Sequence, residues 1–309
     1  MYSRLRIAQK YLSYYLRAAN GKGHGIHSPF VFDFVLNVLN DRFVYPDYAA
    51  IEELRRRTSG DDTLLEIADM GAGSAWKASS QRSIGDITRR AAKSPRLGQL
   101  LYRVARYYRP DTVLELGTSL GFSTAYLAAG AGGARGVREA GDAGAAGLSA
   151  GRPEGRGVVG RGIVGVAGDG WGAGGARTAR VWSIEGAVQV AAAAERNLRS
   201  LGLPVQQVVG NFDMVLPAVL REMGTVGLAF VDGNHRREPT LAYFELLMLH
   251  AARPAVLIFD DIHWSREMEE AWGAIKNDPR VYLTIDLFFI GLVFLREEFK
   301  VKQDFVIRY

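Results

Sequence analysis

The chain has 309 residues and contains no cysteine. This absence excludes disulfides, thiolate metal ligands and cysteine nucleophiles, and it is consistent with a reducing compartment, so we expect a cytoplasmic protein. No apolar run approaches the roughly 18 residues that suggest a membrane-spanning helix, and a membrane partner is therefore not expected. The first ten residues are polar and basic and lack the apolar core of a secretory signal.

Outside residues 130–180, the chain also lacks a strong excess of positive charge. The net charge is +5, but residues 130–180 alone carry seven arginines against four acidic residues. The remainder is close to neutral and would attract a phosphate backbone only weakly. Nucleic acid is therefore not expected as a partner.

The same segment, residues 130–180, is poor in side chains that build a core. It contains 18 glycines and one tryptophan, and it has no phenylalanine or tyrosine. Such a composition cannot bury enough apolar surface to offset the entropy lost on ordering. We predict a mostly disordered insertion rich in glycine, arginine and alanine.

After the insertion, strand and helix patterns alternate, as in a parallel α/β sheet. Predicted strands cover 180–184, 206–209, 227–231 and 255–259, and predicted helices cover 188–201, 212–223, 239–250 and 266–276. Two final strands, 281–288 and 290–295, are joined so closely that they must form an antiparallel hairpin. Residues 1–93 are predicted as a helical N-terminal extension with helices near 4–19, 29–40 and 48–58. Its segment 23–30, with His24 and His27, either forms a lid over the site or packs against the sheet.

Residues 112–128 carry the strongest local signal. A buried strand leads into a glycine turn between Gly117 and Gly121, and a helix then begins with Ser123 and Thr124 in its first turn. Glycine lets the backbone approach a ligand closely, and a helix N-terminus offers free N–H groups to an anion. The glycine spacing is not G-x-G-x-x-G, so this is not a dinucleotide fingerprint.

Glu185 supports a nucleotide site at this turn. It is 70 residues beyond Glu115, and 19 when the insertion is left out. That is the spacing at which an acidic residue ends the second strand and accepts hydrogen bonds from a ribose. A competing glycine loop, residues 69–74, lacks such an acidic strand end and is the weaker candidate.

Residues 115–124, ELGTSLGFST, closely resemble the first motif of class I S-adenosylmethionine (SAM)-dependent methyltransferases, in the variant of the catechol-type, methyltransferase-24-like O-methyltransferases. The resemblance covers residues 94–309. It implies a Rossmann-like, seven-stranded, mostly parallel sheet with a C-terminal antiparallel hairpin, SAM as the cofactor and a small-molecule hydroxyl as the methyl acceptor. It also implies that Ser119 and Ser123 contact the amino-acid part of SAM, and that Asn211 and Phe212 contact adenine.

Acidic residues end four of the predicted strands, where ligands bind in open α/β sheets. They are Glu115, Glu185, Asp232, Asp260 and Asp261. Five carboxylates on one edge are costly unless hydroxyls or cations meet them. We therefore expect a site at this edge, with Glu115 directed into it.

The segments that begin at Asp232 (DGNH) and Asp260 (DDIHW) resemble the two metal-binding segments of cation-dependent relatives. The resemblance implies Mg²⁺ on Asp232, Asp260 and Asp261, and oxygen ligands suit this ion. Asp261 replaces an asparagine of that pattern, and His235 stands where those enzymes have a catalytic lysine. His235, beside Asp232, is the predicted base, because an ordinary histidine pKa of about 6.5 allows proton removal near neutral pH.

The sequence is also compatible with other functions. The carboxylates could instead bind the SAM ammonium and a substrate hydroxyl without a metal. An N- or nucleic-acid methyltransferase is a second hypothesis, although the expected Asn-Pro-Pro-Tyr type of motif is missing. A non-catalytic SAM-binding scaffold is a third. A homodimer is one possible assembly, and His263 and Trp264 are interpreted as pocket wall.

Overall fold

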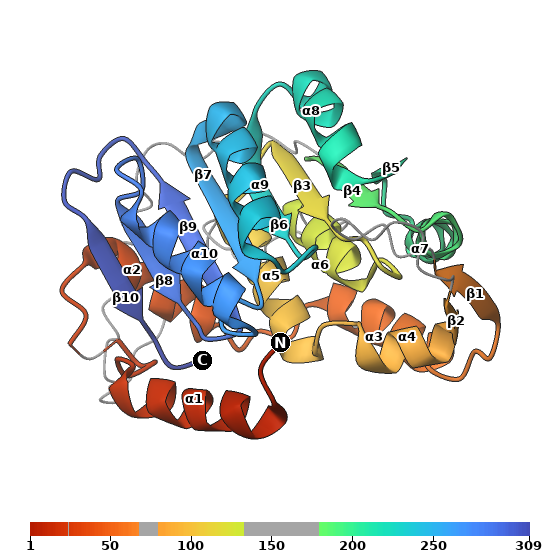
Figure 1. Cartoon of the computed structure of the whole chain (residues 1–309), viewed down its shortest axis with the longest axis horizontal. Helices are drawn as coiled ribbons and strands as arrows, with labels where there is room; N and C mark the ends of the chain where they lie inside the picture. The colour runs from red at the N-terminus through yellow and green to blue at the C-terminus, as the bar shows by residue number, and fades with distance from the viewer. Residues whose placement is uncertain (24, 68–79, 133–178) are drawn as a thin grey trace, which may run out of the picture.

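The computed structural model describes residues 1–23, 25–67, 80–132 and 179–309, and its centre is an eight-stranded sheet (Figure 1). In sheet order the strands are β10 (Gln303–Val306), β8 (Leu283–Asp286), β9 (Ile290–Leu295), β7 (Ala251–Asp260), β6 (Val226–Val231), β3 (Thr112–Leu116), β4 (Arg180–Glu185) and β5 (Gln206–Val209). Only β9 runs antiparallel to its neighbours within this sheet. The predicted parallel sheet with an antiparallel hairpin is confirmed, but β10 adds an eighth strand beside β8 that the sequence did not reveal.

Helices cover both faces of the sheet. In Figure 1, α9 (Arg237–His250) and α10 (Arg266–Asn277) lie in front, and α5 (Pro95–Tyr108) and α6 (Phe122–Ala131) lie behind. The front core also includes α8 (Phe212–Met223), and α7 (Val188–Ser200) packs against α6 at the back. Because both faces are covered, β3 and β6 are buried along their whole length, which explains their continuous apolar runs.

The N-terminal extension shares cores with these layers. Its elements are α1 (Arg4–Arg17), α2 (Pro29–Phe34) with a π-helical turn (Val35–Leu39), α3 (Pro46–Thr58), the hairpin of β1 (Leu64–Ile67) and β2 (Ser80–Ser83), and α4 (Ile84–Arg90). Ser28 caps α2, with Pro29 in its first turn, as predicted. Ile51 of α3 and Ile87 of α4 join one core with α5, α6 and α7. Ile26 packs in the core behind the sheet, and His27 is exposed.

The leucines of α1 do not form its buried face. Leu5, Leu12 and Leu16 are each at least 60% exposed, whereas Tyr14 and Ala18 are buried against Phe288. The helix therefore rests on an aromatic cluster near the turn between β8 and β9, and its leucines point to solvent. A local pattern shows which residues are apolar, but the partner surface decides which face is buried.

Several predictions fall on residues that lie outside the described ranges, namely His24, the loop 69–74 and most of the insertion. The flanks of that loop form the β1–β2 hairpin, which is separate from the main sheet. Gly130 and Ala131 end α6 and Arg180 opens β4, so the insertion lies between these two elements and is shorter than predicted. In the described segments, no helix is both long and apolar enough to cross a membrane.

Candidate active site

The glycine corner lies where β3 approaches β6. Gly117 has φ +102°, and a Cβ there would lie 2.1 Å from the carbonyl oxygen of Asp232. Any other residue would push the two strand ends apart. Ser119 (φ 48°) and Gly121 (φ 85°) also have left-handed backbone, and Gly121 is the N-cap of α6. The first N–H groups of α6, which have no partner within the helix, therefore lie at this corner.

Glu185 joins this corner, as its spacing predicted. Its Oε2 accepts a hydrogen bond from the backbone N–H of Ser119 at 2.8 Å, and its Oε1 accepts one from Ala187 at 3.0 Å. Burial raises the pKa of Glu185, and these N–H donors act in the opposite direction. The carboxylate is fixed beside the loop, where ribose hydroxyls could reach it.

Glu115 does not point into an open crevice, contrary to our expectation. Its side chain is fully buried beneath the corner and accepts hydrogen bonds from the hydroxyls of Thr124 and Ser183. Burial raises its pKa to about 7, although hydrogen bonds from Ser123 and the other two hydroxyls lower it. Glu115 therefore supports the strand end and the first turn of α6 from below.

Asn211 and Phe212 begin α8 at the end of β5. The side chain of Asn211 accepts a hydrogen bond from the N–H of Asp213 at 2.8 Å and caps the helix. Phe212 lies against Gly233, where a Cβ would be 2.4 Å from its ring, and meets the ring of Tyr243 edge-on. The loops after β5 and β6 are thus in contact, while adenine binding by Asn211 and Phe212 stays a prediction.

The carboxyl ends of β6 and β7 bring an acidic cluster together. The side chain of Asp260 is 1% exposed and that of Asp232 is 15% exposed. Ligand atoms of Asp232, His235 and Asp260 all lie within 4.8 Å of one another, a donor set that could hold a cation. Asp261 faces His235 instead, with Nε2 of His235 at 3.9 Å from Asp261 and 3.6 Å from Asp232.

Lys93 is the residue that sequence reasoning missed. Its ammonium lies 3.0 Å from Oδ1 of Asp232 and also bonds to Oδ2 of Asp260. Burial alone lowers the pKa of Lys93, but the three nearby carboxylates outweigh this effect and raise it above its ordinary value. Burial and the charge of Asp232 raise the pKa of Asp260, and Lys93 opposes them. The only signal in the sequence was a lysine directly before the helix start at Ser94 and Pro95.

Unusual backbone conformations gather around this cluster. Asn234 (φ 67°), His235 (φ 26°) and Asp261 (φ 53°) are non-glycine residues in the left-handed region. Such conformations cost free energy and are often retained at functional sites. The observed strain favours a binding or catalytic role for the loops after β6 and β7.

The comparison with known families agrees with this geometry. Residues 114–262 match a family described as a methyltransferase domain. Residues 114–262, from β3 to the loop after β7, thus have the sequence signature of a methyltransferase domain. Among curated proteins, none matches the sequence.

Solved structures show the same fold. Cofactor-bound Rv0187 from MTB is 20% identical and has a TM-score of 0.51, with 88% of this chain and 99% of that chain covered. The SAH-bound methyltransferase PaMTH1 from Podospora anserina is 12% identical and has a TM-score of 0.52, with 96% and 98% covered. At these identities the likeness establishes the class I methyltransferase fold alone.

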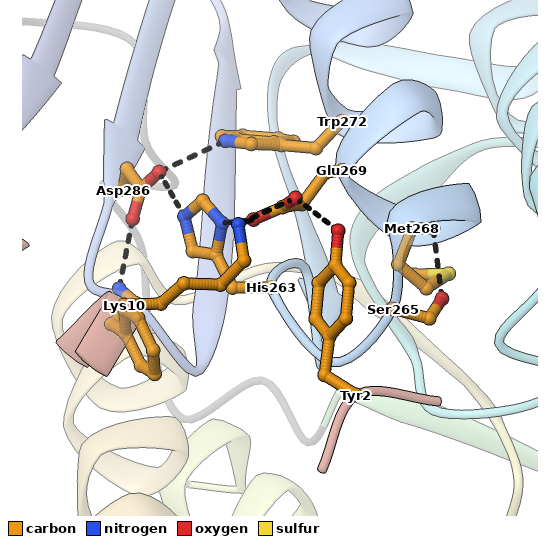
Figure 2. Close-up of polar contacts among 9 residues, drawn as sticks. Tyr2, Lys10, His263, Ser265, Met268, Glu269, Trp272 and Asp286 are labelled. Atoms are coloured by element: carbon orange, nitrogen blue, oxygen red, sulfur yellow. Dashed lines mark hydrogen bonds and ion pairs between the residues drawn. The ribbon is translucent and has the colours of Figure 1, made fainter. Parts of the chain in front are cut away.

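A second polar cluster of the chain surrounds His263 (Figure 2). The imidazole lies between two carboxylates, with Nε2 at 2.9 Å from Asp286 and Nδ1 at 3.0 Å from Glu269, and it stacks on Phe288. Burial alone lowers the pKa of His263, but the two carboxylates outweigh burial and raise it. The ring, in the loop after β7, thus bridges Asp286 of β8 and Glu269 of α10.

Glu269 connects the His263 cluster to the N-terminal extension. It accepts hydrogen bonds from the hydroxyl of Tyr2 at 2.8 Å and from the ammonium of Lys10 at 2.8 Å. The N–H of Tyr2 also donates to the carbonyl of Trp264 at 3.0 Å. His263 and Trp264 therefore help to hold the start of the chain against the methyltransferase domain, a role that the sequence did not indicate.

Proposed function

We propose that the enzyme transfers the methyl group of SAM to a hydroxyl oxygen of a small molecule. The main support is that the glycine corner and Glu185 lie at the same edge of the sheet as His235 and the carboxylates after β6 and β7. The proposed cofactor site and the proposed proton acceptor are therefore neighbours.

The described residues fit SAM. The left-handed corner of Gly117, Ser119 and Gly121 leaves room for close approach, and Glu185 offers a carboxylate for ribose hydroxyls. We propose that Ser119 and Ser123 contact the amino-acid part of the cofactor and that Asn211 and Phe212 contact adenine. The proposed roles of Glu115 and Asp232 are to support the corner from below and to close it beside Gly117.

SAM, when bound, would supply a methyl group on a positively charged sulfur, and its transfer to the acceptor oxygen would leave the electron pair of the broken carbon–sulfur bond on sulfur. Nε2 of His235 takes the acceptor proton, and Asp232 and Asp261 stabilise the resulting imidazolium. The rest of the catalysis is positioning of donor and acceptor in line.

A divalent ion does not fit this arrangement as the chain folds. The donors of Asp232, His235 and Asp260 have suitable chemistry for Mg²⁺. The ammonium of Lys93, however, lies between the two carboxylates that would hold the ion. The proposed reaction therefore contains no metal step.

Calorimetry with SAM, S-adenosylhomocysteine and NAD tests the proposal. We expect the two adenosyl compounds to bind with one site per chain and NAD not to bind. A panel of catechols, phenols and sugar hydroxyls is then screened for release of S-adenosylhomocysteine. Failure of both adenosyl compounds to bind, or binding of NAD in their place, contradicts the proposal.

A further inference from the structure

We propose that Lys93 is the resident cation of this active site and takes the position of a divalent metal ion between Asp232 and Asp260. Its catalytic role rests on the proposed function, because an acceptor oxygen must reach the ammonium. Its structural role does not, because the ion pairs are part of the folded chain.

The geometry of Lys93 matches that role. Nζ lies 3.0 Å from Asp232 and is bonded to the fully buried Asp260, and the side chain of Lys93 is only 15% exposed. A divalent ion held by both carboxylates would lie about 2.0–2.6 Å from their oxygens, in the same space. The ammonium and such an ion therefore exclude each other by volume and by charge.

The charges of the cluster also require a cation. Three carboxylates, those of Asp232, Asp260 and Asp261, meet at the ends of β6 and β7, and a buried carboxylate without a partner is strongly unfavourable. Lys93 supplies a full positive charge there. His235, at 3.6 Å from Asp232, supplies a second one when it carries a proton.

The backbone that carries Lys93 is firmly placed. Lys93 directly precedes Ser94, the N-cap of α5, which accepts a hydrogen bond from Leu97 at 3.4 Å. Gly98 lets α5 approach α6 so closely that a Cβ would lie 2.4 Å from the ring of Tyr126. A packed helix start thus presents the lysine to the cluster, although it is 167 residues from Asp260.

In the reaction, Lys93 binds the acceptor. An ammonium has three N–H groups, and two of them serve the pairs with Asp232 and Asp260. We assign the third to the acceptor oxygen. It stabilises the negative charge that develops on this oxygen as the proton passes to His235, which is the contribution that a metal ion makes in cation-dependent enzymes.

The test is Mn²⁺ binding to the full chain, followed by electron paramagnetic resonance and calorimetry. The wild type and the control Lys300→Met, which removes an exposed lysine, are expected to bind Mn²⁺ no more tightly than millimolar. Lys93→Met is expected to bind Mn²⁺ at least tenfold more tightly, because it frees both carboxylates and removes a positive charge. Micromolar binding by the wild type, or no gain in Lys93→Met, overturns the proposal.

If Lys93→Met fails to fold, micromolar Mn²⁺ binding by the wild type would still overturn the proposal. The double variant Lys93→Met/Asp260→Asn then provides a second readout, since it removes the buried unpaired charge and should recover most of the lost melting temperature. If the double variant is no more stable than Lys93→Met, the ion pair between Lys93 and Asp260 is contradicted. S-adenosylhomocysteine binding is measured in parallel: its failure would count against the proposed function, whereas the Mn²⁺ and melting-temperature results decide whether Lys93 occupies the metal position.

Discussion

The backbone N–H of Ser119 donates to Oε2 of Glu185 at 2.8 Å, and this bond connects the glycine corner to the end of β4. The two residues are 66 positions apart in the sequence. The carboxylate proposed to bind ribose therefore also orders the loop proposed to bind the rest of the cofactor.

Glu185→Ala should lower the affinity for S-adenosylhomocysteine at least tenfold, because hydrogen bonds to a charged group contribute about 1.5–3 kcal/mol. Calorimetry measures the change. Glu195→Ala, at an exposed position of α7, is the matched control and should leave affinity unchanged. Equal affinities of the wild type and Glu185→Ala would contradict the ribose assignment.

His235→Ala should lower the transfer rate by about two to four orders of magnitude near neutral pH, the usual contribution of a general base. Affinity for S-adenosylhomocysteine should not change. With a phenolic acceptor, whose pKa is about 10, the rate should partly recover at higher pH because the acceptor ionises unaided. His250→Ala, on the exposed end of α9, is the control. A rate deficit independent of pH would argue against a base at this position.

Glu115→Gln should flatten the dependence of stability on pH. Burial raises the pKa of Glu115 to about 7, above its value in an unfolded chain. The folded state thus binds more protons between the two pKa values, and stability falls as pH rises through that window, by about 3 kcal/mol at most. Urea unfolding at about pH 5 and pH 7.5 measures the slope, with the exposed Glu297→Gln as control. Equal slopes in the wild type and Glu115→Gln would show that Glu115 does not cause the dependence of stability on pH.

His263→Gln should destabilise the fold more at about pH 6 than at pH 9. The two carboxylates raise the pKa of His263, so its stabilisation is fully present below the pKa of the unfolded chain and is lost as pH rises through the folded value. Thermal unfolding at both pH values tests this, with exposed His27→Gln as control. The same loss at both pH values would mean that packing, not charge, is what His263 contributes.

Replacement of residues 133–178 by a short Gly/Ser linker should leave S-adenosylhomocysteine affinity and melting temperature nearly unchanged. Helix α6 ends at Ala131 and β4 begins at Arg180, and the sequence between them is poor in core-forming side chains. A fall of more than about 10 °C would far exceed the effect of losing 1 kcal/mol in a domain of this size. It would show that the insertion is part of the folded core.

The sequence by itself determined the alternation of strands and helices and the sheet edge at which the candidate site residues lie. These features are local, since apolar periodicity marks each element and the carboxyl ends of parallel strands share one edge. The placement of Glu185 at the glycine corner followed from spacing once the insertion was left out. The acidic ends at Asp232 and Asp260 followed from the same pattern.

Only the tertiary structure decided which partner each of these side chains meets. It placed Glu115 beneath the corner, turned Leu5 and Leu12 of α1 toward solvent, and brought Lys93 between Asp232 and Asp260. Each outcome depends on contacts between segments far apart in the chain, and no local period encodes such contacts. A lysine before a helix start is an ordinary surface residue until the packing of α5 on α6 carries it into an acidic cluster.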